Sequence, residues 1–212
     1  MTQPYSHTAR LSALGLGLTR GANVLFSGLS FQVSPGDMLW VGGANGIGKT
    51  SLLKCVAGLL RPDSGEIAFD PDRPRIAYQG HRDAHKPGLT AFENLCFWHG
   101  VLGSDVSVQT AMQRARIWHL KDQHAKSLSA GQSRRLSLAR LLIHDAPLWI
   151  MDEPFAALDL AGQDLVKSML ADHIAKNGCA LLASHGGAVS IGGNTRLLQF
   201  TRPKEEAHNG RF

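Results

Sequence analysis

The sequence has few cysteines and no long apolar run, and each absence excludes a class of protein. Only three of its 212 residues are cysteines, and they are odd in number, widely spaced and set among apolar residues: Cys55, Cys96 and Cys179. We therefore expect reduced core thiols rather than a disulfide framework or a metal cluster. No apolar run approaches the ~20 residues that a membrane-spanning helix needs. The first residues lack the basic and then apolar pattern of a secretory signal, so we expect a protein that stays in the cytosol.

Basic runs are also missing. Lys and Arg number 22 against 17 acidic residues, a formal net charge of +5. This mild excess suits nucleic acid, an anionic membrane surface or only a nucleotide site. Without runs of Lys or Arg and interleaved aromatic residues, we expect no nucleic-acid partner. Among the histidines, His81 and His85 are either a ligand pair for metal or haem, or solvated or hydrogen-bonded side chains. No third ligand stands at a familiar spacing, which favours the second interpretation.

A glycine-rich stretch at residues 43–51 fits the phosphate-binding pattern G-x-x-x-x-G-K-[ST]. A short buried strand is predicted before it at residues 38–41 and a helix after it at 51–60, so backbone N–H groups and a helix N-terminus would face phosphate oxygens. Lys49 would reach the β- and γ-phosphates of a bound nucleoside triphosphate, and Thr50 would bind Mg²⁺. The residues predicted to hold ATP are Gly43, Ala44, Asn45, Gly46, Ile47, Gly48, Lys49, Thr50 and Ser51.

With 43% apolar and 18% charged residues, the chain has the composition of a globular α/β protein. Periodicity and turn residues predict strands at residues 10–18, 24–33, 38–41, 66–69, 75–79, 148–151, 179–183 and 196–200. The same criteria predict helices at residues 51–60, 91–101, 106–119, 136–143 and 160–177. We interpret residues 1–212 as one domain, with a core at about 10–79 and 141–202, a helical insertion at about 80–140 and a disordered tail at 203–212.

Two carboxylates, Asp152 and Glu153, follow the apolar strand predicted at residues 148–151. In a phosphate-loop enzyme such a strand ends beside the nucleotide, so Asp152 can hold Mg²⁺ while Glu153 faces the γ-phosphate. Adjacent residues at a strand end point in different directions, which allows the two roles. Alone the pattern is weak, but together with the phosphate loop it indicates an NTP-hydrolysing site.

Further motifs resemble those of ATP-binding cassette (ABC) ATPases. The sequence LSAGQ at residues 128–132 resembles the family's LSGGQ signature and precedes the acidic strand as it does there. Gln79 resembles the Q-loop glutamine, residues 157–159 the D-loop, and His185 the switch histidine. The resemblance covers nearly the whole chain. It implies a phosphate-loop (RecA-like) α/β core, an antiparallel β subdomain that includes residues 10–33, and an inserted helical subdomain.

The resemblance also implies a mechanism. Two copies of the chain would trap two ATP molecules, with Lys49, Mg²⁺ and His185 neutralising the transferred phosphate. Glu153 would orient or deprotonate the attacking water, and Gln79 would sense water and bind the metal beside Thr50 and Asp152. The second copy would add its signature and D-loop residues in trans: Ser129, Gly131, Gln132 and Asp159.

Arg20 stands where the family often has an aromatic residue that stacks on adenine. A guanidinium plane can also stack on a base, which would bind adenine with weaker selectivity. The alternative is that Arg20 is an exposed turn residue.

Residues 88–95, 128–135 and 146–155 are similar to the ATP-binding subunits of bacterial cytochrome c maturation (Ccm) haem exporters. That resemblance implies membrane-spanning partners and a peripheral place on the cytoplasmic face of the inner membrane. Two alternatives are an energising subunit of an unrelated exporter or importer, and a soluble, non-transport cassette protein. One apolar set in the helical insertion is either core or a groove for a membrane partner: Leu95, Phe97, Trp98, Val101 and Leu102.

Overall fold

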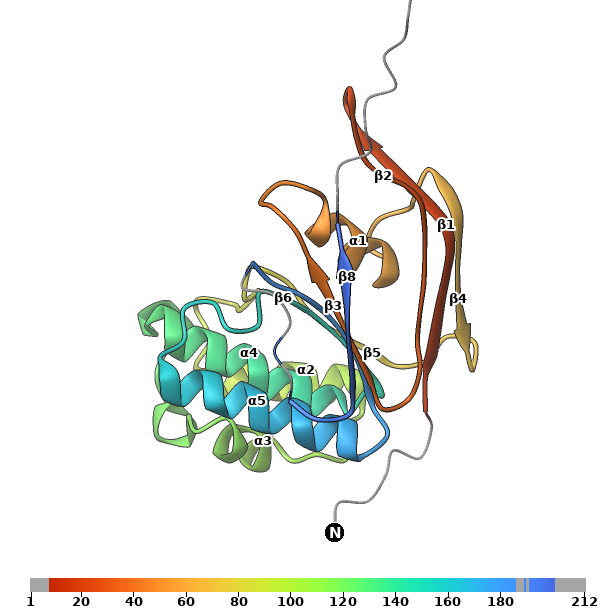
Figure 1. The fold of residues 1–212 in the computed structure, drawn as a ribbon. Helices are drawn as coiled ribbons and strands as arrows, with labels where there is room; N and C mark the ends of the chain where they lie inside the picture. The colour runs from red at the N-terminus through yellow and green to blue at the C-terminus, as the bar shows by residue number, and fades with distance from the viewer. Residues whose placement is uncertain (1–7, 186–188, 190, 201–212) are drawn as a thin grey trace, which may run out of the picture.

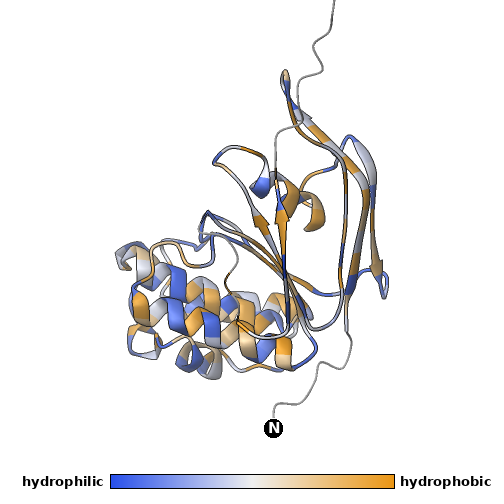
Figure 2. Ribbon diagram, in the orientation of Figure 1, coloured by the Kyte–Doolittle hydropathy of each residue, from blue (hydrophilic) through white to orange (hydrophobic). Residues whose placement is uncertain are grey.

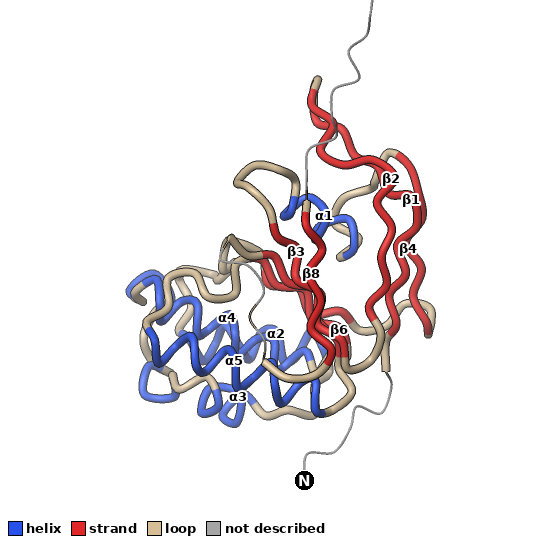
Figure 3. Tube along the Cα trace, in the orientation of Figure 1, coloured by secondary structure: helices blue, strands red, loops and turns tan. Residues whose placement is uncertain are grey.

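The computed structural model describes residues 8–185, 189 and 191–200. A five-stranded parallel sheet lies between a layer of helices and a smaller antiparallel sheet, with helix α1 between the two sheets (Figures 1 and 3). This confirms the predicted α/β architecture. The predicted disordered tail at 203–212 lies outside the described residues.

The antiparallel sheet has the strand order β2-β1-β4, with bounds β1 (Arg10–Arg20), β2 (Asn23–Val33) and β4 (Ser64–Asp70). The predicted hairpin is confirmed, because β1 pairs with β2 up to Arg20 and Asn23, across a turn in which Gly21 has a φ of 59°. The strand predicted at residues 66–69 joins this sheet on the other side of β1.

The parallel sheet has the order β5-β6-β7-β3-β8, with bounds β3 (Asp37–Gly42), β5 (Ile76–Gln79), β6 (Leu148–Asp152), β7 (Cys179–Ala183) and β8 (Asn194–Gln199). Every pair of neighbours is parallel. Strands β3, β6 and β7 are buried throughout, as their continuous apolar runs predict for a sheet covered on both faces.

Side chains alternate between the two faces of this sheet. Trp40 and Met151 belong to the core shared with the helical layer, whereas Leu39 and Ile150 belong to the core shared with α1 and the antiparallel sheet. The hydropathy colouring shows apolar residues along both sheets and on α1, and mixed faces on the outer helices (Figure 2). The period of two in the strands therefore decides which residues can reach α1.

The helices are α1 (Lys49–Val56), α2 (Ala91–Leu102), α3 (Val108–Arg114), α4 (Ala130–His144) and α5 (Leu160–Ala175). Within the described residues, none is long and apolar enough to cross a membrane. Helix α4 begins earlier than predicted because Ser129 and Gln132 form a capping box, and it runs across the expected subdomain boundary at residue 140.

Several sequence predictions are wrong in detail. The helix predicted at residues 51–60 spans Lys49–Val56, and Gly58 beyond it has a left-handed φ of 71°. The helix predicted at residues 106–119 ends at Arg114, because Arg116 has a left-handed φ of 58°, and a 3₁₀ turn follows at Trp118–Leu120. Cys55 and Cys179 are buried free thiols, but Cys96 is exposed on α2, so it is not a core residue.

The core contains a histidine that makes the fold sensitive to acid. His173 on α5 is buried, its ring stacks on Trp149 with centroids 4.1 Å apart, and its Nε2 lies 3.0 Å from the carbonyl oxygen of Cys179. Burial lowers the pKa of His173 to about 4. Because an unfolded histidine titrates near 6.5, the unfolded state binds more protons between these values, and stability falls as the pH drops through this window.

We expect His173 alone to lower the free energy of unfolding by about 2 kcal/mol between pH 7.5 and pH 5. Urea unfolding at the two pH values measures this difference. The variant His173→Gln should be less sensitive to pH, whereas His119→Gln, at an exposed position, should behave like the parent. Equal sensitivity of the parent and His173→Gln would contradict the prediction.

Candidate functional site

The predicted phosphate loop connects β3 to α1 and lines a cavity of about 360 Å³. All three of its glycines have positive φ angles: 144° at Gly43, 73° at Gly46 and 118° at Gly48. A Cβ on Gly48 would also lie 3.0 Å from the Cβ of Leu25, so both the backbone conformation and the close approach of Leu25 disfavour a side chain there. The cavity is lined by Leu25, Ala44, Asn45, Gly46, Ile47, Gly48, Lys49, Thr50, Ser51, His81, Asp152, Glu153 and His185.

Lys49 is buried at the centre of this loop. Its Nζ donates to the carbonyl oxygens of Gly43 and Ala44 at 2.6 and 3.1 Å, and lies 3.2 Å from Nδ1 of His185. The ammonium group has only donors, so Nδ1 of His185 accepts and the ring proton lies on Nε2. That Nε2 lies 3.0 Å from Oε1 of Glu153. Three groups predicted to act on the terminal phosphate are therefore in one chain of contacts.

Asp152 and Thr50 meet on the α1 side of the sheet. Asp152 is the last residue of β6 and has the same parity as Ile150, which places its side chain toward α1. The Thr50 hydroxyl donates to Oδ2 of Asp152 over 2.8 Å. A hydroxyl and a carboxylate next to the phosphate loop are oxygen ligands of the kind that Mg²⁺ prefers, so the residues present fit this ion.

Gln79 and His81 occupy different environments. Gln79 has the same parity as Ala77, which packs in the core shared with the helices, and it is completely buried. In the described part of the chain, no group hydrogen-bonds with its amide nitrogen or oxygen. Gln79 does not line the cavity, whereas His81, two residues later, does. The role predicted for Gln79 stays a prediction, and His81 is the residue of this segment that the sequence did not single out for the nucleotide.

A second cavity of about 370 Å³ brings together the four residues predicted to act in trans: Ser129, Gly131, Gln132 and Asp159. Asp159 accepts from the backbone N–H of Gly162 over 2.8 Å and lies 3.1 Å from Nη2 of Arg135. Both contacts lower the pKa of Asp159, the backbone hydrogen bond most. This cavity shares no residue with the phosphate-loop cavity, as expected if the signature residues serve the nucleotide of another copy.

Arg20 lies apart from these residues. It is exposed at the end of β1 and does not line the cavity, where Leu25 of β2 is the residue from this hairpin. The structure thus places Arg20 at the exposed end of β1, next to the turn, and adenine stacking by its guanidinium remains a prediction.

The apolar set on α2 divides between the interior and the surface. Leu95 is buried and Leu102 packs against the core, whereas Phe97 and Val101 have exposed fractions of 42% and 62%. The ring of Phe97 also lies under the Lys86 ammonium, 3.7 Å from its centroid. The set therefore contributes both to the core and to an exposed surface.

His85 has partners within the protein. Its Nε2 lies 3.0 Å from the carbonyl oxygen of Ser133 and 3.2 Å from the hydroxyl of Ser137. Burial lowers its pKa, which favours the neutral ring. The surroundings of His85 are those of a histidine hydrogen-bonded inside the fold.

The fold and the first cavity define a phosphate-loop ATPase, and comparison with known proteins agrees. The sequence pattern of the ABC transporter family matches residues 26–156. A dimeric structure of a bacterial ABC transporter cassette superposes with a TM-score of 0.77 at 19% identity, over 89% of this chain and 94% of that one. The structure of an ATP-binding subunit of an ABC transporter gives 0.75 at 23% identity, over 82% and 79%.

Curated relatives are more similar in sequence. The cytochrome c biogenesis ATP-binding export protein CcmA of Rhodopseudomonas palustris (strain HaA2) is 44% identical over 183 residues, 83% of this chain and 92% of that protein. CcmA of Methylococcus capsulatus is 42% identical over 205 residues, 91% and 99% of the two chains. The chain belongs to the ABC transporter family and, within it, to the CcmA ATP-binding proteins.

Proposed function

We propose that this chain is the ATP-hydrolysing subunit of a membrane ABC transporter complex that acts in cytochrome c biogenesis. The observation that carries the proposal is its 44% identity, over 92% of the relative's length, to a protein named for cytochrome c biogenesis and export. The cavity around Lys49 supports the catalytic part, because it joins a phosphate loop to two carboxylates and a histidine.

Binding of ATP follows from the geometry of the loop. The backbone N–H groups of the loop and the Lys49 ammonium would bind the phosphate oxygens, at the N-terminus of α1. Thr50 and Asp152 would hold Mg²⁺, which supplies positive charge against the β- and γ-phosphates. The carbonyl oxygens that Lys49 now contacts keep its ammonium inside the loop before ATP arrives.

Hydrolysis needs a water held in line with the γ-phosphate. Glu153 lines the cavity and its side chain is 16% exposed. The Thr50 hydroxyl donates to Asp152 and not to Glu153. We assign to Glu153 the orientation or deprotonation of that water. His185, held by Lys49 and Glu153, is placed to donate from Nε2 toward the oxygens on which charge develops.

Dimer formation would complete the site. The second cavity holds Ser129, Gly131, Gln132 and Asp159 away from the chain's own phosphate loop. We propose that two copies face each other, so that each cavity of signature residues meets the nucleotide of the other copy. The partner membrane subunits would dock on the helical layer, with the ATPase peripheral on the cytoplasmic face of the membrane.

Affinity isolation tests this function. A tagged Glu153→Gln chain, purified with ATP from detergent-solubilised membranes, should bring down membrane-spanning transporter subunits of the cytochrome c maturation system together with a haem-bearing chaperone, seen by its absorbance. The tagged Lys49→Ala chain, which is expected to bind nucleotide much more weakly, is the control. Isolation of a different membrane permease would contradict the proposed role in cytochrome c biogenesis but would leave the assignment of the ATP site unchanged. No membrane partner, together with salt-sensitive nucleic-acid binding, would favour a soluble cassette protein.

A further inference from the structure

Arg134 is a buried arginine on α4 whose guanidinium contacts the backbone at the carboxyl end of β6. Only 4% of its side chain is exposed. Burial lowers the pKa of Arg134, whereas the nearby acidic groups of Asp83, Asp152 and Glu153 raise it. The guanidinium of an arginine stays protonated in proteins, so Arg134 carries a buried positive charge. A buried charge is costly unless it is paired and hydrogen-bonded, so the contacts of this guanidinium are needed to offset the cost of burying it.

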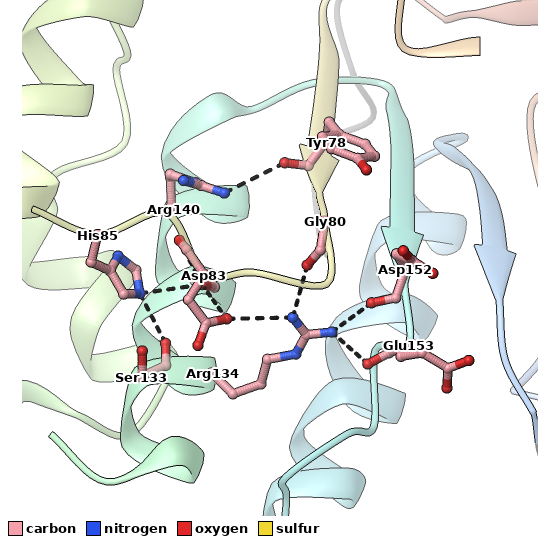
Figure 4. Close-up of polar contacts among 10 residues, drawn as sticks. Tyr78, Gly80, Asp83, His85, Ser133, Arg134, Arg140, Asp152 and Glu153 are labelled. Carbon is pink, nitrogen blue, oxygen red and sulfur yellow. Dashed lines mark hydrogen bonds and ion pairs between the residues drawn. The ribbon is translucent and has the colours of Figure 1, made fainter. Parts of the chain in front are cut away.

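The first contacts of Arg134 hold the end of β6. Its Nη2 donates to the carbonyl oxygen of Asp152 over 2.7 Å and to that of Glu153 (Figure 4). These two carbonyls belong to the peptide groups on either side of Glu153. The N–H of Glu153 in turn donates to the carbonyl oxygen of Ala183 over 2.9 Å. Both peptide planes that set the direction of the Glu153 side chain are therefore fixed by hydrogen bonds.

The backbone of Glu153 needs such support. Its φ is 50°, in the left-handed region, where a residue with a Cβ costs about 1–2 kcal/mol. Such conformations persist only where the surrounding structure determines them. The hydrogen bonds from Arg134 are part of the surroundings that hold Glu153 in this conformation.

The other contacts of Arg134 hold the loop after β5. Its Nη1 donates to the carbonyl oxygen of Gly80 over 3.1 Å and lies 3.4 Å from Oδ1 of Asp83 (Figure 4). That carboxylate oxygen also accepts from the Ser137 hydroxyl over 2.9 Å. The Gly80 carbonyl belongs to the peptide group before His81, the residue of this loop that lines the ATP cavity. One guanidinium thus joins β6, this loop and α4.

We propose that Arg134 is a positioning residue for ATP hydrolysis, which holds the backbone of Glu153 and the loop before His81 in fixed relation to helix α4. The inference rests on the proposed role of Glu153. Ser129, the N-cap of helix α4, lines the cavity of signature residues, so the same guanidinium connects that cavity to the carboxylate that acts on water. Displacement of α4 would be transmitted to Glu153 through these hydrogen bonds.

The test compares Arg134→Gln and Arg134→Lys with the parent, as full chains with MgATP. A displaced carboxylate lowers kcat, and we expect a roughly 10- to 100-fold decrease for both variants. Lysine keeps the charge, but its ammonium does not reproduce the planar fork that contacts both segments, so it should not rescue the rate. ATP affinity should stay within about threefold of the parent, since Arg134 lines neither cavity.

Arg140 provides a matched control. It is a buried arginine on the same helix, its Nη2 lies 3.5 Å from the carbonyl oxygen of Tyr78, and it contacts neither Asp152 nor Glu153 in the structure (Figure 4). Arg140→Gln should lower the urea midpoint and leave kcat within about twofold of the parent. An equal loss of kcat in Arg140→Gln would mean that Arg134 acts through stability alone, which overturns the proposal.

The remaining outcomes separate this inference from the proposed function. If Glu153→Gln is inactive while both Arg134 variants keep the parent kcat, the inference fails and the function stands. If Glu153→Gln keeps the parent rate, the proposed role of Glu153 fails first. If Arg134→Lys keeps the parent kcat while Arg134→Gln does not, Arg134 acts through its charge alone, and the proposal of a positioning role is overturned. If the Arg134 variants do not fold, Asp83→Asn should lower kcat several-fold at unchanged ATP affinity, and an unchanged kcat would overturn the inference.

Discussion

Replacing Glu153 by glutamine is expected to lower ATP turnover by about 10²- to 10⁴-fold while ATP still binds. Glutamine has nearly the same shape, but it cannot take a proton from water. The Glu153 side chain lines the cavity at the end of β6, with Oε1 3.0 Å from Nε2 of His185. Phosphate release and nucleotide binding, measured on the same preparation, separate the two effects.

A matched control for this variant is Glu66→Gln. Glu66 is exposed on β4 of the antiparallel sheet, away from the phosphate loop, and its loss of charge should not change turnover. A Glu153→Gln chain that hydrolyses ATP at the parent rate would remove Glu153 from the proposed role. Loss of ATP binding in this variant would show that Glu153 contributes to nucleotide binding rather than to the hydrolysis step alone.

Lys49→Ala is expected to lose ATP binding, with a Kd raised about a hundredfold, because two charge-assisted hydrogen bonds to phosphate contribute about 1.5 kcal/mol each. The Lys49 ammonium is also bonded to two carbonyl oxygens of the loop, so its removal frees the loop to change shape. Titration with a fluorescent ATP analogue measures the affinity. Lys54→Ala, on the exposed side of the same helix, should bind like the parent, and an unchanged affinity in Lys49→Ala would refute the assignment.

The phosphate loop and the acidic strand end could be predicted because each is contiguous in the sequence. Residues 43–51 need only their own glycines and flanking elements to form an anion cradle. The alternation of side chains along β6 can also be inferred from the sequence. It places Asp152 on the same face as Ile150, where Asp152 meets Thr50 of α1. The order of buried strands follows less directly, since it depends on crossovers between distant segments.

Gln79 and His81 show where sequence reasoning stops. A glutamine at the end of a strand before a loop matches the expected motif, yet the alternation of β5 turns it toward the helical core. The path of the loop, held by Arg134, then brings His81 to the cavity. Arg134 itself carries no sequence signal beyond its place after the signature residues. The prediction of a core position for Cys96 is wrong, because an apolar neighbourhood in sequence does not decide which face of α2 is covered.

By itself the sequence determined the class of this protein: the loop that binds phosphate, the paired carboxylates, the signature stretch and the alternation of buried strands are all local patterns. The tertiary structure alone decided how these pieces act together. It separated the signature cavity from the phosphate loop, linked Lys49, His185 and Glu153, and put Arg134 between three segments. Such contacts join residues far apart in the chain, and their geometry depends on how the sheet and helices pack rather than on any local propensity.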